Sequence, residues 1–131
     1  MVHRFEVDVR WADLDPYRHV NHATYLAYCE SARIALLEDI GFSMRRLAEL
    51  DRQIVIVRLE ARWLAPALED MTVTVETEVD EVGRVRSAWR QRVLHGDEVL
   101  FDAVVEAAFT DPSGRPRRAP EGFVEAASGA A

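Results

Sequence analysis

Apolar and polar residues alternate over positions 3 to 11, which predicts a β-strand with one buried face. The apolar side of this segment carries His3, Phe5, Val7, Val9 and Trp11. After residue 52 the chain again follows strand patterns, rich in Val and Thr and interrupted by turns at Gly83 and Gly96. These later predicted strands are residues 53–64, 71–80, 84–94 and 98–110.

The segment between the first strand and residue 52 has helical spacing instead. Apolar residues recur every three or four positions from near His22, Asn21 is suited to the N-cap, and Gly41 is suited to the position after the last turn. This helix is expected to span about 18 residues, or roughly 27 Å. Residues 43–50 predict a short second helix capped by Ser43.

One helix cannot cover both faces of a five-stranded sheet, so the sheet is expected to curl around it. The order of elements therefore predicts an α+β fold in which a five-stranded antiparallel sheet is wrapped around one long helix. An exposed sheet edge favours pairing with a second copy, which predicts a homodimer or a homotetramer. We expect a single domain over residues 1–120 and a flexible tail over residues 121–131.

Composition excludes several classes of function. The chain has 131 residues and a formal net charge of −7, which argues against a nucleic-acid partner. It contains no Lys, which excludes Schiff-base chemistry and a Walker A loop. No apolar run has the length of a membrane helix, and the first residues show no signal-peptide core. The single Cys29 lies on the apolar helix stripe, so we expect a buried thiol in a cytoplasmic protein.

Reactive side chains are concentrated directly before the long helix. The segment reads Asp13-Leu14-Asp15-Pro16-Tyr17-Arg18-His19-Val20-Asn21-His22. A helix start offers unpaired N–H groups and a partial positive charge, which stabilise a developing oxyanion. A carboxylate a few residues upstream can fold back over the same opening. This short loop can therefore supply both an oxyanion hole and a base or nucleophile.

Other interpretations of the same residues remain open. An Asp before Pro, as in Asp15-Pro16, is a common turn element, and Asp13 is expected to orient or cap the loop. His19 either holds Asp15 through a hydrogen bond or is a partly buried histidine satisfied by backbone groups. The set Asp13, Asp15, His19 and His22 could also be read as a metal site, but its spacing matches no familiar zinc pattern.

A longer motif runs from this loop into the helix. It reads Asp15-Pro16-Tyr17-Arg18-His19-Val20-Asn21-His22-Ala23-Thr24-Tyr25-Leu26 and is followed by Glu30-Ser31-Ala32-Arg33. These residues resemble the signature of hotdog-fold thioesterases of the 4-hydroxybenzoyl-CoA thioesterase type, and look closest to the bacterial long-chain acyl-CoA thioesterases. Weaker agreement continues at Trp63-Leu64-Ala65-Pro66-Ala67 and at Asp102-Ala103, so the resemblance reaches about Pro120.

The resemblance implies hydrolysis of a fatty or aromatic acyl-CoA thioester, without a metal or redox cofactor, in a site at a dimer interface. The general base or nucleophile of such enzymes corresponds to Asp15, and the residue whose backbone N–H binds the thioester oxygen corresponds to His22. Asn21 is expected to cap the helix and so to place that donor. Some relatives carry Asn where this chain has His22, so the resemblance does not define a role for the His22 side chain.

Three further residues are candidates for contacts with substrate. Tyr25 is placed to line the acyl pocket, and Arg84 and Ser87, near a turn, are placed to bind the anionic nucleotide of CoA. In the hairpin expected here, however, Glu78 lies opposite Arg86, and the arginines of this strand then form ordinary cross-strand ion pairs.

Three other functions are weighed against acyl-CoA hydrolysis. One is hydrolysis of acyl-carrier-protein thioesters on the same fold. A second is hydratase chemistry, whose pattern places Asp and His five residues apart, whereas Asp15 and His19 are four apart. The third is a non-catalytic acyl-CoA-binding module, which predicts tight binding without turnover.

Overall fold

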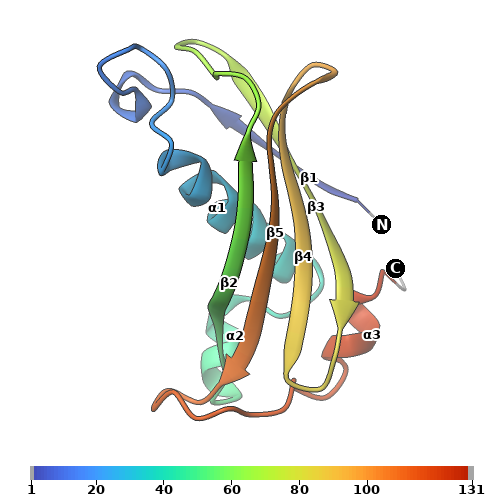
Figure 1. Cartoon of the computed structure of the whole chain (residues 1–131). Helices are drawn as coiled ribbons and strands as arrows, with labels where there is room; N and C mark the ends of the chain where they lie inside the picture. Colours follow the sequence, from blue (N-terminus) through green and yellow to red (C-terminus); the bar gives the residue numbers. More distant parts are fainter. Residues whose placement is uncertain (1, 130–131) are drawn as a thin grey trace.

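The protein folds as one curved antiparallel sheet with a long helix on its concave side, in a computed structural model that describes residues 2–129 (Figure 1). The strands are β1 (His3–Asp8), β2 (Gln53–Trp63), β3 (Thr72–Val82), β4 (Arg86–His95) and β5 (Glu98–Thr110). They lie in the order β1-β3-β4-β5-β2, and every neighbouring pair is antiparallel. The predicted five-stranded sheet around one long helix is therefore confirmed. No helix among the described residues is both long and apolar enough to cross a membrane.

The long helix α1 (Thr24–Asp39) begins two residues later than the sequence predicted. The side-chain oxygen of Asn21 accepts the N–H of Ala23 at 2.9 Å, and its carbonyl oxygen accepts the N–H of Thr24 at 2.9 Å. Asn21 thus arranges the start of the helix from just outside it. Gly41 has a φ of 90°, a conformation that favours glycine, and ends the helix as predicted.

Strand β1 is shorter than the alternation predicted. It ends at Asp8, and Trp11–Asp13 form a 3₁₀ turn that leaves the Trp11 side chain 75% exposed. The carboxylate of Asp13 accepts the backbone N–H of Arg10 at 3.0 Å, which turns the chain out of the sheet. A side chain therefore replaces a neighbouring strand as the hydrogen-bond partner, and alternation alone could not reveal this.

The β3–β4 hairpin is longer than predicted. Val82 pairs with Ser87 and Glu78 pairs with Arg90, so Arg86 does not lie opposite Glu78. Strand β3 continues past its predicted end at residue 80 and β4 begins later than residue 84, because the turn lies further along the chain, where the N–H of Gly83 donates to the carbonyl of Arg86. A register irregularity between Val79 and Glu81 changes the pairing by one residue. Ion pairs do join the exposed sheet face, where Glu76 binds both Arg4 at 3.2 Å and Arg92 at 2.7 Å.

Part of the segment after residue 120 forms a short helix that packs against the core. Helix α3 (Phe123–Ala127) buries Phe123 completely, and its ring meets Phe109 edge to face at 4.8 Å and Phe42 at 5.3 Å. An aromatic anchor thus holds this helix on the core despite the Ala-rich composition around it, while the flexibility expected over residues 121–131 stays a prediction. Residues 130 and 131 lie outside the described part of the chain.

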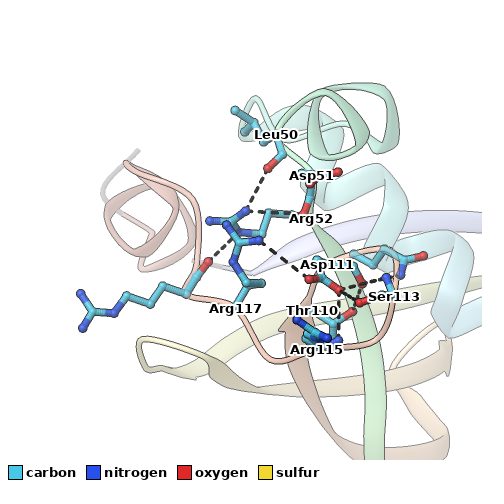
Figure 2. Close-up of polar contacts among 10 residues, drawn as sticks. Leu50, Asp51, Arg52, Thr110, Asp111, Ser113, Arg115 and Arg117 are labelled. Atoms are coloured by element: carbon cyan, nitrogen blue, oxygen red, sulfur yellow. Dashed lines mark hydrogen bonds and ion pairs between the residues drawn. The ribbon is translucent and has the colours of Figure 1, made fainter.

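A polar junction fixes the start of β2 to the end of the sheet (Figure 2). Arg52 donates from Nε to the carbonyl of Arg118 at 2.8 Å and from Nη1 to the carbonyl of Leu50 at 3.0 Å. The carboxylate of Asp111, just after β5, accepts the backbone N–H of Ser113 at 2.9 Å. Short helix α2 (Met44–Glu49), capped by a Ser43 side chain as predicted, leads into this junction.

Strand β2 forms an edge of the sheet and is exposed along most of its length. Its partly exposed large apolar residues are Val55, Ile56, Val57, Leu59 and Trp63. An open strand edge with apolar side chains is the surface on which proteins pair with another strand. This strand runs from the Arg52 junction at one end of the molecule to the reactive loop at the other (Figure 1).

Candidate active site

The loop before α1 holds the carboxylate of Asp15 in a fixed direction. Its Oδ1 accepts the backbone N–H of Tyr17 at 2.8 Å and that of His19 at 3.1 Å. The main chain closes the same loop, because the N–H of Asp15 donates to the carbonyl of His19 at 2.7 Å. Arg18 supports the tight turn with a φ of 64°. Oδ2 of Asp15 accepts no hydrogen bond from the described residues, so one carboxylate oxygen stays available for chemistry.

His19 holds this loop through its backbone and not through its ring. The ring makes no hydrogen bond to Asp15, whereas the His19 N–H and carbonyl both bind that residue. His19 also forms a bridge to Leu68, and the next residue, Val20, donates its N–H to the carbonyl of Ala67 at 2.9 Å. The loop is therefore anchored to the segment that follows β2.

The backbone N–H of His22 makes no hydrogen bond within residues 2–129, although it stands at the entrance to α1. Its carbonyl accepts the indole N–H of Trp63 at 3.1 Å, which fixes the peptide that follows. The imidazole of His22 meets the Trp63 ring edge to face at 6.3 Å. A free N–H held in place near a helix start is a preorganised donor for an anion.

Asp15 and His22 line one cavity of about 320 Å³. Other side chains around it are His19, Tyr25, Trp63 and Leu64. Asp15 also borders a second hollow of about 250 Å³, on the side of Trp11 and Arg18. The sequence located Asp15, His19, His22 and Tyr25 but not the residues that follow β2 or end it. Trp63 enters from the far end of β2, and the only signal for it was the weak Trp63–Ala67 agreement.

Asp13 lies behind the loop, away from the cavity. Its buried carboxylate accepts the hydroxyl of Tyr28 at 2.7 Å and the backbone N–H of Arg10 at 3.0 Å, and its carbonyl accepts the N–H of Asn21 at 2.8 Å. Burial by itself raises the pKa of Asp13. The hydrogen bonds from Arg10 and Tyr28 and the Arg10 charge outweigh burial and lower this pKa below its usual value. Asp13 thus orients the loop and is not available as a metal ligand beside Asp15. Among the described residues no cluster of His, Cys, Asp and Glu is arranged to hold a metal ion.

Two other sequence candidates do not lie at this cavity. Ser87 is buried on β4, where its hydroxyl accepts the indole N–H of Trp89 at 2.8 Å. Arg84 is exposed on the β3–β4 turn, at the end of the sheet where Gln53 pairs with Thr110, far from the Trp63 end of β2. Within one chain, neither residue is near Asp15.

Cys29 is the buried core thiol that its helix position predicted. Burial raises the pKa of this thiol to about 12, so it stays protonated at neutral pH and is a poor nucleophile. Asp15, by contrast, lines the cavity with one carboxylate oxygen unpaired among the described residues.

Comparison with known proteins supports one family. The model of the thioesterase-like superfamily matches residues 9–127. A curated relative from Haemophilus influenzae, the acyl-CoA thioesterase YbgC, is 32% identical over 108 residues, covering 82% of this chain and 79% of its own. The acyl-acyl carrier protein thioesterase ATL2 of Arabidopsis thaliana is 28% identical over 120 residues and 90% of this chain. The match spans only 64% of that plant protein's length.

A solved structure has the same architecture. A probable thioesterase from Bartonella henselae superimposes with a TM-score of 0.89 at 34% sequence identity, covering 92% of this chain and all of that one. The family model, which begins at residue 9, covers the loop before α1 and the four strands β2, β3, β4 and β5.

Proposed function

The chain is a thioester hydrolase of the thioesterase-like superfamily, with its hotdog fold, and on this premise we propose that it hydrolyses fatty or aromatic acyl-CoA to free acid and CoA. One observation carries the proposal: Asp15, with a free carboxylate oxygen, and the unpaired N–H of His22 line the same cavity. The first supplies a base or nucleophile and the second a donor for the oxyanion.

The chemistry follows from this pairing. Oδ1 of Asp15 is held by two backbone N–H groups, while Oδ2 can take a proton from water or attack the thioester carbon itself. Either attack moves the carbonyl electron pair onto oxygen, which the His22 N–H stabilises. Collapse of this intermediate expels the CoA thiolate. Where water attacked, the free acid forms directly; where Asp15 attacked, water then hydrolyses the mixed anhydride, which releases the acid and restores the carboxylate. One such oxyanion donor supplies about 3 to 4 kcal/mol of transition-state stabilisation. Asn21 acts indirectly, by arranging the helix start that presents this donor.

A second copy of the chain completes the proposed site. Two β2 edges that pair about a two-fold axis run antiparallel, which places the Gln53 end of one strand beside the Trp63 end of the other. The β3–β4 turn, with Arg84, lies at the Gln53 end. Pairing therefore carries Arg84 of the partner subunit toward Asp15, where it would meet the CoA phosphates. Ser87 is better explained as a core residue that supports Trp89.

Acyl-carrier-protein thioesters are a second candidate substrate, favoured by the name of the plant relative. The reaction and the two reacting groups are the same in both cases. Only the carrier of the pantetheine arm differs.

The test measures release of free CoA from short, long and aromatic acyl-CoAs, with acyl-carrier-protein thioesters in parallel. Wild type is compared with Asp15→Asn and with the matched control Asp80→Asn, which alters an exposed carboxylate on β3. We expect turnover to collapse in Asp15→Asn and to persist in Asp80→Asn. Tight acyl-CoA binding without turnover in wild type would instead establish a binding module. Turnover that survives Asp15→Asn would remove Asp15 from the mechanism.

A further inference from the structure

Tyr25 is a buried tyrosine that lines the cavity of the candidate active site. Its side chain is 2% exposed, and its ring stacks on Phe101 with centroids 5.1 Å apart and an interplanar angle of 22°. The ring of Tyr28 meets the ring of Tyr25 edge to face, with centroids 6.3 Å apart. These contacts leave the ring no freedom to turn, so the direction of the hydroxyl is set by packing.

The hydroxyl of Tyr25 uses only its acceptor capacity. It accepts the backbone N–H of Ala67 at 2.9 Å, and its own O–H has no acceptor among the described residues. A phenol carries one donor and can accept as well, so the donor remains unused in a nearly fully buried side chain. Buried donors are ordinarily paired, so a donor left free in a residue that lines a cavity is available to a group bound there.

The position of Tyr25 relates this unused donor to the one at His22. Both residues line the cavity that contains Asp15, and Tyr25 lies three positions after His22, on the first turn of α1. His22 itself precedes the helix, so it is the shared cavity that brings the two residues together. The backbone of Ala67 fixes both elements, because its N–H binds Tyr25 and its carbonyl binds the N–H of Val20 in the loop.

We propose that the Tyr25 hydroxyl is a catalytic residue, the second hydrogen-bond donor of the oxyanion hole, acting on the thioester oxygen together with the His22 N–H. This inference rests on the proposed thioesterase function. As the nucleophile adds to the thioester carbon, the carbonyl electron pair moves to oxygen, which accepts both hydrogen bonds. When the carbon–sulfur bond breaks, the pair returns and the thiolate leaves. Tyr25 keeps its proton throughout.

The environment of Tyr25 suits a donor and excludes a base. Burial raises the pKa of the phenol; the N–H of Ala67 offsets part of this rise, and the charge of Asp15 adds to it. The hydroxyl therefore stays protonated at neutral pH. The hydrogen bond accepted from Ala67 also polarises the oxygen, which strengthens the hydrogen bond that its O–H donates.

The first experiment is turnover of acyl-CoA by Tyr25→Phe, which keeps the ring on Phe101 and removes the hydroxyl. We expect kcat to fall about 10²–10³-fold with KM changed little, the loss measured when one oxyanion-hole donor is removed. A folded Tyr25→Phe protein whose kcat stays within about threefold of wild type would overturn the proposal. Absence of turnover in wild type would instead refute the proposed function itself.

A second measurement decides the matter even if Tyr25→Phe does not fold. In the Asp15→Asn protein, a bound acyl-CoA labelled with ¹³C at the thioester carbonyl reports hydrogen bonding through its infrared stretch. Replacing Tyr25 by 3-fluorotyrosine preserves its shape and makes its O–H a stronger donor, so the stretch should move to lower frequency. An unchanged stretch would show that this hydroxyl does not contact the thioester oxygen.

Discussion

The hydroxyl of Tyr28 donates a 2.7 Å hydrogen bond to the carboxylate of Asp13, fifteen residues earlier in the chain. This contact joins the second turn of α1 to the back of the loop that carries Asp15. The carbonyl of Asp13 in turn accepts the N–H of Asn21, which arranges the start of the same helix. The loop and the helix start are thus fastened to each other at a point outside the cavity.

Loss of the Tyr28 hydroxyl is expected to loosen this attachment. Tyr28→Phe leaves a buried carboxylate with one hydrogen bond fewer, which costs about 2 kcal/mol in the free energy of unfolding. Because Tyr28 does not line the cavity, kcat should fall through disorder of the loop and not through loss of a contact with substrate. Urea unfolding and kinetics on the same preparation measure both effects. Unchanged stability would show that Tyr28 does not hold Asp13 in solution.

The lowered pKa of Asp13 predicts how this stabilisation depends on pH. The folded-state pKa lies below the ordinary value of 3.8, so the ionised carboxylate contributes stability that is fully present above that value. The contribution is lost as pH falls through the folded-state pKa. The difference in unfolding free energy between wild type and Asp13→Asn should therefore be constant near neutral pH and shrink below about pH 4. A difference that grows on acidification would contradict this assignment.

The backbone role of His22 can be separated from any role of its ring. His22→Pro removes the unpaired N–H of this cavity-lining residue, whereas His22→Ala removes the imidazole and keeps the N–H. We expect His22→Pro to lower kcat about 10²–10³-fold and His22→Ala to keep most of the activity that the proline variant loses. Thermal melting of both variants controls for damage to the helix start. Equal losses in the two would assign the function to the ring.

Most of the fold follows from local patterns in the sequence. The end of α1 at Gly41 and the Ser43 cap of α2 depend on neighbouring residues only, and both are as predicted. The β3–β4 register is not as predicted, since the strands pair as far as Val82 and Ser87, with the turn further along the chain than the alternation indicated. Phe123 likewise finds partners far away in the sequence, so its burial was invisible in the composition of the tail.

The candidate site, like the fold, was predicted from the sequence only where it depends on neighbouring residues. The motif placed Asp15, His22 and Tyr25 together, because they belong to one loop and one helical turn, and the structure brings all three to one cavity. It did not reveal that Trp63 binds the carbonyl of His22 from the end of a strand 41 positions later. Nor did it reveal the free hydroxyl of Tyr25, because the donor from Ala67 arrives through tertiary folding.

A substitution of Ser87 tests whether this residue stabilises the core or contacts CoA. Its hydroxyl accepts the indole N–H of Trp89, a fully buried side chain, so Ser87→Ala leaves that donor unpaired. We expect the free energy of unfolding to drop by about 1 to 3 kcal/mol and KM for acyl-CoA to stay unchanged. Chemical denaturation and steady-state kinetics check the two parts. A higher KM at normal stability would restore Ser87 as a contact for CoA.

The edge of β2 predicts the oligomeric state on which the proposed site depends. Leu59→Lys places a charge in the middle of this partly exposed apolar strand and should convert a dimer to monomers. Val104→Lys adds the same charge on the neighbouring strand β5, away from the edge, and should leave the dimer intact. Analytical ultracentrifugation distinguishes the two. Dimers that persist in Leu59→Lys would place the interface elsewhere.

Mixed dimers test whether Arg84 acts across this interface. Arg84→Glu alone should raise KM for acyl-CoA about tenfold, the effect of losing one charged contact with phosphate. Asp15→Asn alone should abolish turnover.

If each site combines Asp15 of one subunit with Arg84 of its partner, a dimer of these two variants contains one site with both residues intact and one site that lacks both. Mixing the inactive variant with the high-KM variant should therefore restore low-KM turnover. Adding Leu59→Lys to both variants should abolish the restoration, because no dimer forms. If Arg84 instead serves the Asp15 of its own subunit, every active site in the mixture carries Arg84→Glu, and KM stays high at any mixing ratio.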